Sequence, residues 1–265
     1  MPDALTPAAL WRNVRDGVCG IGPVPPGSWG LPREADEGRG GVVRGFEAVF
    51  DPGGFRVPAA ELAGLDEVFR WVLHAGREAL RECGGEHLLP RAALVLGTLS
   101  YPSPGAVRWA AGAWLSAGPG ADPRDRFFSG LPAHLAARAL GLGLGGFALD
   151  AACASSLYAV KLACDRLSRG AADLVLAGGV SHADPVLLHR GFRELAALSP
   201  TGRSRPFHRD ADGLVPAEGA GVVALVRLAD ARAAGMPVAA VIRGVGLGND
   251  GAAGGLLVPS GEGQE

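Results

Sequence analysis

The sequence contains a single lysine, Lys161, so nearly all of its positive charge comes from arginine. It has no block rich in basic residues, and 25 basic against 27 acidic residues give a net charge of -2. A nucleic-acid-binding surface needs concentrated positive charge, so we expect no nucleic-acid partner. No apolar run approaches the roughly 18 residues that cross a bilayer. No charged segment followed by an apolar one marks a signal peptide. These absences favour a cytoplasmic protein with no membrane partner.

The sequence is also poor in cysteine and has no paired metal-ligand motif. Its four cysteines lie far apart, none of them in a CxxC pair, at Cys19, Cys83, Cys153 and Cys164. No cluster of histidine and cysteine has the spacing of a zinc site, so we expect no metal. Cysteines without obvious disulfide partners are typical of a reducing compartment.

What the sequence does have is an alternation of apolar strand-like runs and helix-period segments. With 265 residues, 48% of them hydrophobic, the chain can bury a substantial core. Fully apolar strands between helices predict an α/β fold, with a mostly parallel mixed sheet between helices. The expected strands are 92–99, 146–150, 172–180, 220–227 and 237–247. The expected helices are 6–16, 58–83, 132–140, 153–169, 185–195 and 228–234, with irregular chain at 20–57 and 100–130.

The most informative stretch is 146–157, GFALDAACASSL, where an apolar run ends in small residues around Cys153. A helix-period pattern follows at once, with Leu157, Val160, Cys164 and Leu167 at spacings of three and four. The pattern predicts a thiol at the tip of a strand-to-helix turn. A helix N-terminus favours the thiolate, which is the nucleophile, and its N–H groups can receive an oxyanion. The alternative is that Cys153 is a buried small hydrophobic residue.

One glycine pattern matches a nucleotide-binding motif in spacing but not in structural context. Gly141, Gly143 and Gly146 satisfy GxGxxG, but they follow a predicted helix and open a strand. A dinucleotide site needs the reverse order, so we expect no nucleotide cofactor.

Three separated segments together resemble the N-terminal half of β-ketoacyl synthases, the condensing enzymes of fatty acid and polyketide assembly. They are DAACASS at 150–156, the stretch 191–223 with LSPTGRSRPF and EGAGVV, and GVGLGNDG at 244–251. The third segment looks most like synthases of polyketide or polyunsaturated fatty acid type.

The resemblance implies a thiolase-like fold, in which two similar halves build five αβαβα layers. Residues 1–265 would then form an incomplete N-terminal domain that lacks the first strand and the C-terminal half. Cys153 would accept an acyl chain from the phosphopantetheine of an acyl carrier protein. Decarboxylation of a malonyl-type extender and attack on the acyl-cysteine would follow. The resemblance implies no bound cofactor, and it implies a homodimer or pairing with a C-terminal synthase half.

In the family, two histidines of the C-terminal half assist decarboxylation, in a His-Gly-Thr-Gly-Thr and an Asn-x-Gly-His segment. None of the six histidines of this chain matches, so we expect inefficient condensation by this chain alone. We expect surface or loop positions for all six: His74, His87, His134, His182, His189 and His208.

Two further residues have competing interpretations. By analogy with the family, Phe192 could line an acyl tunnel, and an ordinary core aromatic is an equal alternative. Glu218 lies in a Gly-rich loop, and we expect it to bond that loop and not to catalyse.

Three functions therefore stay open. The first is a condensing enzyme that acts through Cys153. The second is a non-catalytic subunit that dimerises with a complete synthase; Cys153 argues against it, because such subunits usually lack the cysteine. The third is a cysteine acyltransferase or hydrolase with a local base, for which no histidine stands out.

Overall fold

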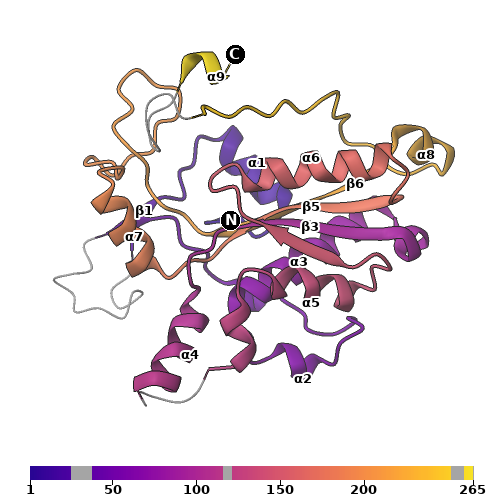
Figure 1. The fold of residues 1–265 in the computed structure, drawn as a ribbon, viewed down its shortest axis with the longest axis horizontal. Coiled ribbons are helices and arrows are strands. Elements are labelled where there is room, and N and C mark those ends of the chain that lie inside the picture. The colour runs from indigo at the N-terminus through magenta and orange to yellow at the C-terminus, as the bar shows by residue number, and fades with distance from the viewer. Residues whose placement is uncertain (25–37, 116–120, 252–259, 265) are drawn as a thin grey trace.

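The computed structural model describes residues 1–24, 38–115, 121–251 and 260–264, which fold into an α/β structure around one main sheet (Figure 1). Two very short strands, β1 (Gly22–Pro23) and β2 (Arg39–Gly40), pair separately near the N-terminus.

The main sheet has four strands in the order β4-β3-β5-β6. The β3 strand is parallel to both of its neighbours, whereas β6 is antiparallel to β5. The expected mostly parallel mixed sheet is therefore confirmed. The strands are β3 (Ala92–Thr98), β4 (Gly146–Leu149), β5 (Leu174–Ser181) and β6 (Gly219–Val226).

Alternate side chains of the central strands enter two separate cores. On one face, Leu94 and Leu176 belong to the larger core. On the other face, Val95 and Val175 belong to a smaller core with side chains of α6 (Ser155–Ser168). Burial on both faces explains why these strands read as continuous apolar runs.

Helices cover both faces of the sheet (Figure 1). The larger core lies under α3 and α5, and the smaller one under α6. The remaining elements are α1 (Pro7–Arg15), η2 (Phe46–Ala48), α2 (Ala59–Leu62), α3 (Glu67–Cys83), η3 (Glu86–Arg91), α4 (Pro104–Leu115), η4 (Pro123–Phe127), α5 (Leu131–Leu140), α7 (Pro185–Glu194), α8 (Leu228–Ala233) and α9 (Gly261–Gln264).

The single helix expected over 58–83 is instead two helices, α2 and α3. Asp66 separates them: its extended backbone leaves the helical path, and its side chain accepts the Val68 N–H at 2.9 Å. A capping aspartate satisfies an amide that lacks a partner in the first helical turn. The new helix start fixes the position of Asp66 and Glu67 beside the sheet.

Two other expectations were wrong. Residues 100–130 contain a regular helix, α4, whose weak amphipathic pattern hid it. Residues 237–247, expected as a strand, have no regular structure, and Val238, Val241 and Ile242 are exposed. A strand needs a neighbour for its backbone hydrogen bonds, and among the described strands the sheet ends at β6.

The start of α6 packs close to the sheet because the strands carry glycine at this point. A Cβ on Gly97 of β3 would lie 2.5 Å from the Ser155 carbonyl carbon, and one on Gly179 of β5 would lie 3.0 Å from the Ser156 Cβ. Further along, Ala159 and Ala163 are fully buried against the same face. Small residues on both sides therefore set the height of α6 above the sheet.

We predict that Gly97→Ala lowers the free energy of unfolding by about 1–3 kcal/mol, because the backbone of α6 must shift to admit the methyl group. The control is Gly221→Ala in β6, where a Cβ would meet nothing within 4 Å. Denaturant unfolding of both variants checks this. Equal stability of the two would contradict the close-packing argument.

Candidate active site around Cys153

Cys153 lies in the turn between β4 and α6, beyond the carboxyl end of its strand. Its side chain is exposed and its thiol is free. The helix begins at Ser155, so the cysteine precedes its first turn by two residues. The strand-to-helix turn expected from the sequence is confirmed, and the interpretation of Cys153 as a buried hydrophobic residue is wrong.

The Asp150 carboxylate organises the start of this turn. It accepts the Ala152 N–H at 2.8 Å and the Ser100 N–H at 2.8 Å, which ties the turn to the chain after β3. Hydrogen bonds from Ser100 and Ala152 lower the pKa of this carboxyl. Asp150 therefore stays ionised and keeps both bonds over the physiological pH range.

Ser155 organises the end of the turn from a buried position. Its Oγ donates to the Ala152 carbonyl at 2.6 Å and accepts the Ala151 N–H at 2.8 Å. Between these bonds, Ala152 adopts a left-handed backbone with φ of 50°. That conformation costs a non-glycine residue roughly 1–2 kcal/mol. Strain of this kind persists where surrounding bonds over-determine the backbone, as they do here.

The turn leaves fewer free amides than the sequence suggested. The N–H groups of Ala154, Ser155 and Leu157 already donate to carbonyls at 3.2, 3.1 and 3.0 Å. These three amides are therefore not open oxyanion donors.

The helix face expected from the sequence is also partly wrong. Leu157 is 65% exposed, and the residues of α6 that face the sheet are Ala159, Ala163 and Leu167. Because α6 packs closely over Gly97 and Gly179, its alanines face the sheet and Leu157 faces outward.

Phe192, the candidate acyl-pocket residue, comes from a different element than Cys153. It is half-buried on α7, which follows β5, whereas Cys153 follows β4. The β3 strand separates these two strands in the sheet. The acyl-pocket role of Phe192 stays a prediction.

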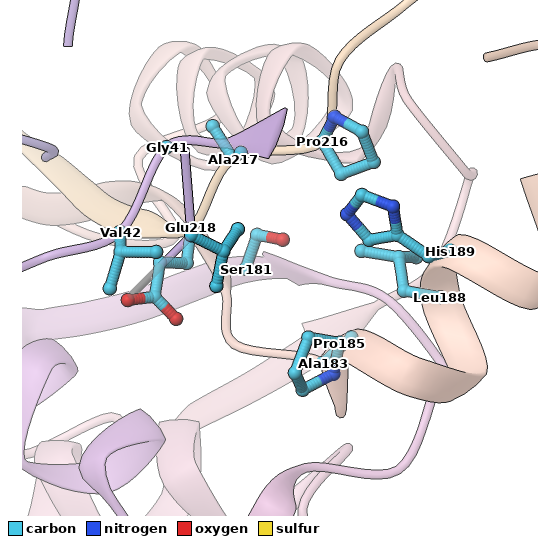
Figure 2. A pocket seen from close by; sticks show the side chains of 12 residues that line it. Gly41, Val42, Ser181, Ala183, Pro185, Leu188, His189, Pro216, Ala217 and Glu218 are labelled. Carbon is cyan, nitrogen blue, oxygen red and sulfur yellow. The ribbon is translucent and has the colours of Figure 1, made fainter. Parts of the chain in front are cut away.

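A small cavity of about 80 Å³ lies at the β5 and β6 side of the same sheet edge. Figure 2 shows His189 and Leu188 of α7 facing Ala217 and Gly41, with Ser181 at the end of β5. Cys153 does not line this cavity.

The long loop before β6 is held by its own side chains. Asp212 accepts the hydroxyls of Ser199 at 2.7 Å and Thr201 at 2.6 Å and pairs with Arg205 at 3.2 Å. Hydrogen bonds from Thr201 and Ser199 lower the pKa of this carboxyl. Glu218 accepts the Val43 N–H at 2.7 Å. The bonds of Asp212 agree with the loop interpretation, whereas Glu218 bonds Val43 of another segment and not the loop that contains it.

His74 and His189 are half-buried on helices α3 and α7, and His182 departs furthest from the expected surface or loop position. The His182 side chain is only 9% exposed and lies among carboxylates. His208 is exposed, as expected, with 54% of its side chain accessible. The sequence signal for His182 is its position directly after a buried strand. Its partners at 66, 67 and 218 are too distant in sequence to infer.

Within the described residues, no group of three or more histidine, cysteine, aspartate or glutamate side chains has the arrangement of a metal site. No described helix has the length and apolar character needed to cross a membrane.

The comparison with known families decides the classification. The family model for the β-ketoacyl synthase N-terminal domain matches residues 1–231. This chain belongs to the β-ketoacyl synthase family. The matched region includes the Cys153 turn and all four strands of the main sheet.

Curated relatives are polyketide synthases. A phenolphthiocerol/phthiocerol polyketide synthase of Mycobacterium tuberculosis is 36% identical over 96% of this chain and 14% of that protein. The erythronolide synthase of Saccharopolyspora erythraea is 32% identical over 99% of this chain and 8% of that protein. This chain therefore spans only a small part of the relatives it matches.

Solved structures show the same fold. A PfaC keto synthase–chain length factor superposes with a TM-score of 0.81 at 31% identity, covering 89% of this chain and 29% of that one. A ketosynthase from the bacillaene synthase of Bacillus subtilis gives 0.72 at 27% identity, covering 89% and 39%. The expected thiolase-like α/β fold is confirmed.

We predict that iodoacetamide labels the exposed Cys153 and Cys19 several-fold faster than the half-buried Cys83 and Cys164. Burial raises the pKa of the Cys83 and Cys164 thiols, so less thiolate is present to react. Peptide mass spectrometry after brief labelling measures the order. Labelling of Cys164 as fast as that of Cys153 would contradict it.

Proposed function

We propose that Cys153 is the acyl-accepting nucleophile of a condensing enzyme in fatty acid or polyketide assembly. The observation that carries this proposal is an exposed thiol on a strained, hydrogen-bonded strand-to-helix turn in a chain of this family. An exposed position lets a thioester carbonyl approach, and a rigid turn holds the sulfur in one place for attack.

The loading step transfers an acyl group between two thiols. The Cys153 thiolate attacks the carbonyl carbon of an acyl thioester on the phosphopantetheine of an acyl carrier protein. The tetrahedral intermediate collapses with loss of the pantetheine thiolate, which takes up the proton that Cys153 released. The products are an acyl-cysteine and a free carrier thiol, and the step uses no cofactor bound to this chain.

The residues around Cys153 position it and do not exchange protons in this step. Asp150 and Ser155 hold the two sides of the turn through four hydrogen bonds. Gly97 of β3 allows the start of α6 to pack close to the sheet. Substitutions at these three positions act through the placement of the sulfur.

In our proposal, residues 1–265 do not supply every group that condensation needs. We assign extender decarboxylation and carbanion attack to a site completed by a C-terminal synthase half that carries the two family histidines. In this assignment residues 1–265 form the N-terminal, cysteine-bearing part of the domain, and the acyl carrier protein is the substrate-delivering partner.

Exposed apolar side chains near Cys153 support a protein partner. Leu157 and Leu162 of α6 are 65% and 37% exposed. Phe147 on β4 is 40% exposed, and β4 is an edge of the described sheet. We propose that a C-terminal half or a second copy covers these exposed apolar side chains.

We predict that an acyl carrier protein thioester adds one acyl group to the chain, detected by intact-protein mass spectrometry. Cys153→Ala removes this adduct, because the accepting sulfur is gone. Cys164→Ala, on the following helix, keeps it and serves as the control. Acylation of Cys153→Ala at the rate of the unmodified chain would refute the assignment.

We also predict that the isolated chain self-associates, and that Leu157→Glu shifts it toward monomer because the charge opposes burial of that surface. Sedimentation velocity measures both. A monodisperse monomer of the unsubstituted chain would contradict the proposed partner surface.

A further inference from the structure

A buried histidine lies among three carboxylates at the sheet edge, apart from the proposed acyl site. His182 follows the last residue of β5, and its side chain is 9% exposed. Its Nδ1 is 3.0 Å from the Glu218 carboxylate. Its Nε2 is 3.5 Å from Glu67 and 3.7 Å from Asp66. The Trp71 ring lies 4.5 Å from the imidazole between centroids and closes one side.

These carboxylates belong to elements that are distant in the sequence. Asp66 and Glu67 form the start of α3, and Glu218 directly precedes β6. Glu218 also holds the Val43 N–H at 2.7 Å, and Gly41 forms a bridge to Ala217. The imidazole is therefore the common neighbour of the β5 end, the β6 start, the α3 start and, through Glu218, the 41–43 segment.

Other charged groups surround this cluster. Arg70 is 3.6 Å from Glu67, and Glu47 also interacts with that carboxylate. Arg108 is 4.0 Å from Asp66, and the buried Asp125 accepts the Asp66 N–H at 3.1 Å. The Met1 amino group interacts with the charge of Glu218. The cluster thus holds more negative than positive groups when His182 is neutral.

We propose that the protonated imidazole of His182 is a pH-dependent clasp that fastens these four segments together, and that rising pH releases it. The imidazolium can donate a hydrogen bond from Nδ1 to Glu218 and form ion pairs from Nε2 to the α3 carboxylates. The neutral ring keeps one donor only, and the carboxylates it faced then repel one another. The inference does not depend on Cys153, since none of these groups belongs to the proposed acyl site.

The electrostatics of the folded chain support the direction of the effect. Burial by itself lowers the pKa of His182, but the bond to Glu218 and the charges of Asp66, Glu218 and Glu67 outweigh it, so the pKa rises above the ordinary 6.5. A histidine whose folded pKa is raised stabilises the fold fully below 6.5. This stabilisation is lost as the pH rises through the folded value.

Two carboxyls of the cluster act in the same direction. Burial raises the pKa of Asp125 to about 6, and burial also raises the pKa of Glu67. Folded carboxyls that hold their protons longer than unfolded ones stabilise the fold at low pH and lose that effect as the pH rises. The Asp125 contribution is lost mainly between pH 3.8 and about 6, below the window of the histidine.

The Glu218 end of the clasp also lines the 80 Å³ cavity with Ser181 and Ala183 (Figure 2). Release of Glu218 would free one wall of that cavity together with the 41–43 segment. The expected consequence of alkaline pH is local loosening at this edge while the central strands stay packed.

The test is the pH dependence of the melting temperature of the full chain between about pH 5.5 and about pH 8.5. We expect the melting temperature of the unsubstituted chain, relative to that of His182→Asn, to fall by about 2–4 °C toward the upper value. The comparison is between variants because burial lowers the pKa of His74, His189 and the Met1 amino group, which opposes the effect of His182 equally in both proteins. His182→Asn is less stable than the parent at the lower pH and converges with it at the upper one. The exposed-histidine control, His208→Asn, keeps the parental pH dependence. A pH dependence of the melting temperature in His182→Asn equal to that of the parent would overturn the proposal.

A second measurement does not need a folded His182 variant. Proton NMR of the imidazole Cε1–H groups follows each histidine through the titration, and Glu218→Gln identifies the resonance of His182 by shifting its midpoint downward. The clasp requires a His182 midpoint above that of His208. A His182 midpoint at or below that of His208, or no downward shift in Glu218→Gln, would overturn the proposal.

Discussion

The close contact between the start of α6 and the glycines of the sheet is the constraint on which the rest of this structure depends. Gly97 and Gly179 have no side chain where Ser155 and Ser156 press onto the strands. Because α6 begins so close to the sheet, the turn before it must be short and sharply bent. Ala152 takes the left-handed backbone that this bend needs, and Cys153 is left outside, exposed to solvent.

The sheet edge then separates two sets of groups with different chemistry. The Cys153 turn follows β4 and is neutral apart from Asp150, which two backbone amides satisfy. The His182 cluster follows β5 and concentrates carboxylates around a buried imidazole. The β3 strand lies between them in the sheet. The Cys153 turn suits nucleophilic attack on a thioester. The His182 cluster links segments that are distant in the sequence through charge.

Features with local causes could be predicted from the sequence. The buried strand Leu174–Ser181 is a continuous apolar run, and the Cys153 turn follows from small residues between a strand and a helix. Features that depend on residues distant in the sequence could not be predicted. The spacing of Leu157 suggests the sheet face, because spacing alone cannot show that Gly97 and Gly179 favour alanine on the helix. The strand expected at 237–247 lacks a pairing partner among the described strands, which periodicity does not reveal.

The central claim is that this packing holds Cys153 in position to accept an acyl group. The most direct test compares the rate of acyl transfer from an acyl carrier protein to folded Gly97→Ala and to folded Gly221→Ala. We expect slower loading in the first variant, because α6 and its turn are displaced, and an unchanged rate in the second. Equal rates in the two variants would show that the position of the sulfur does not depend on this contact.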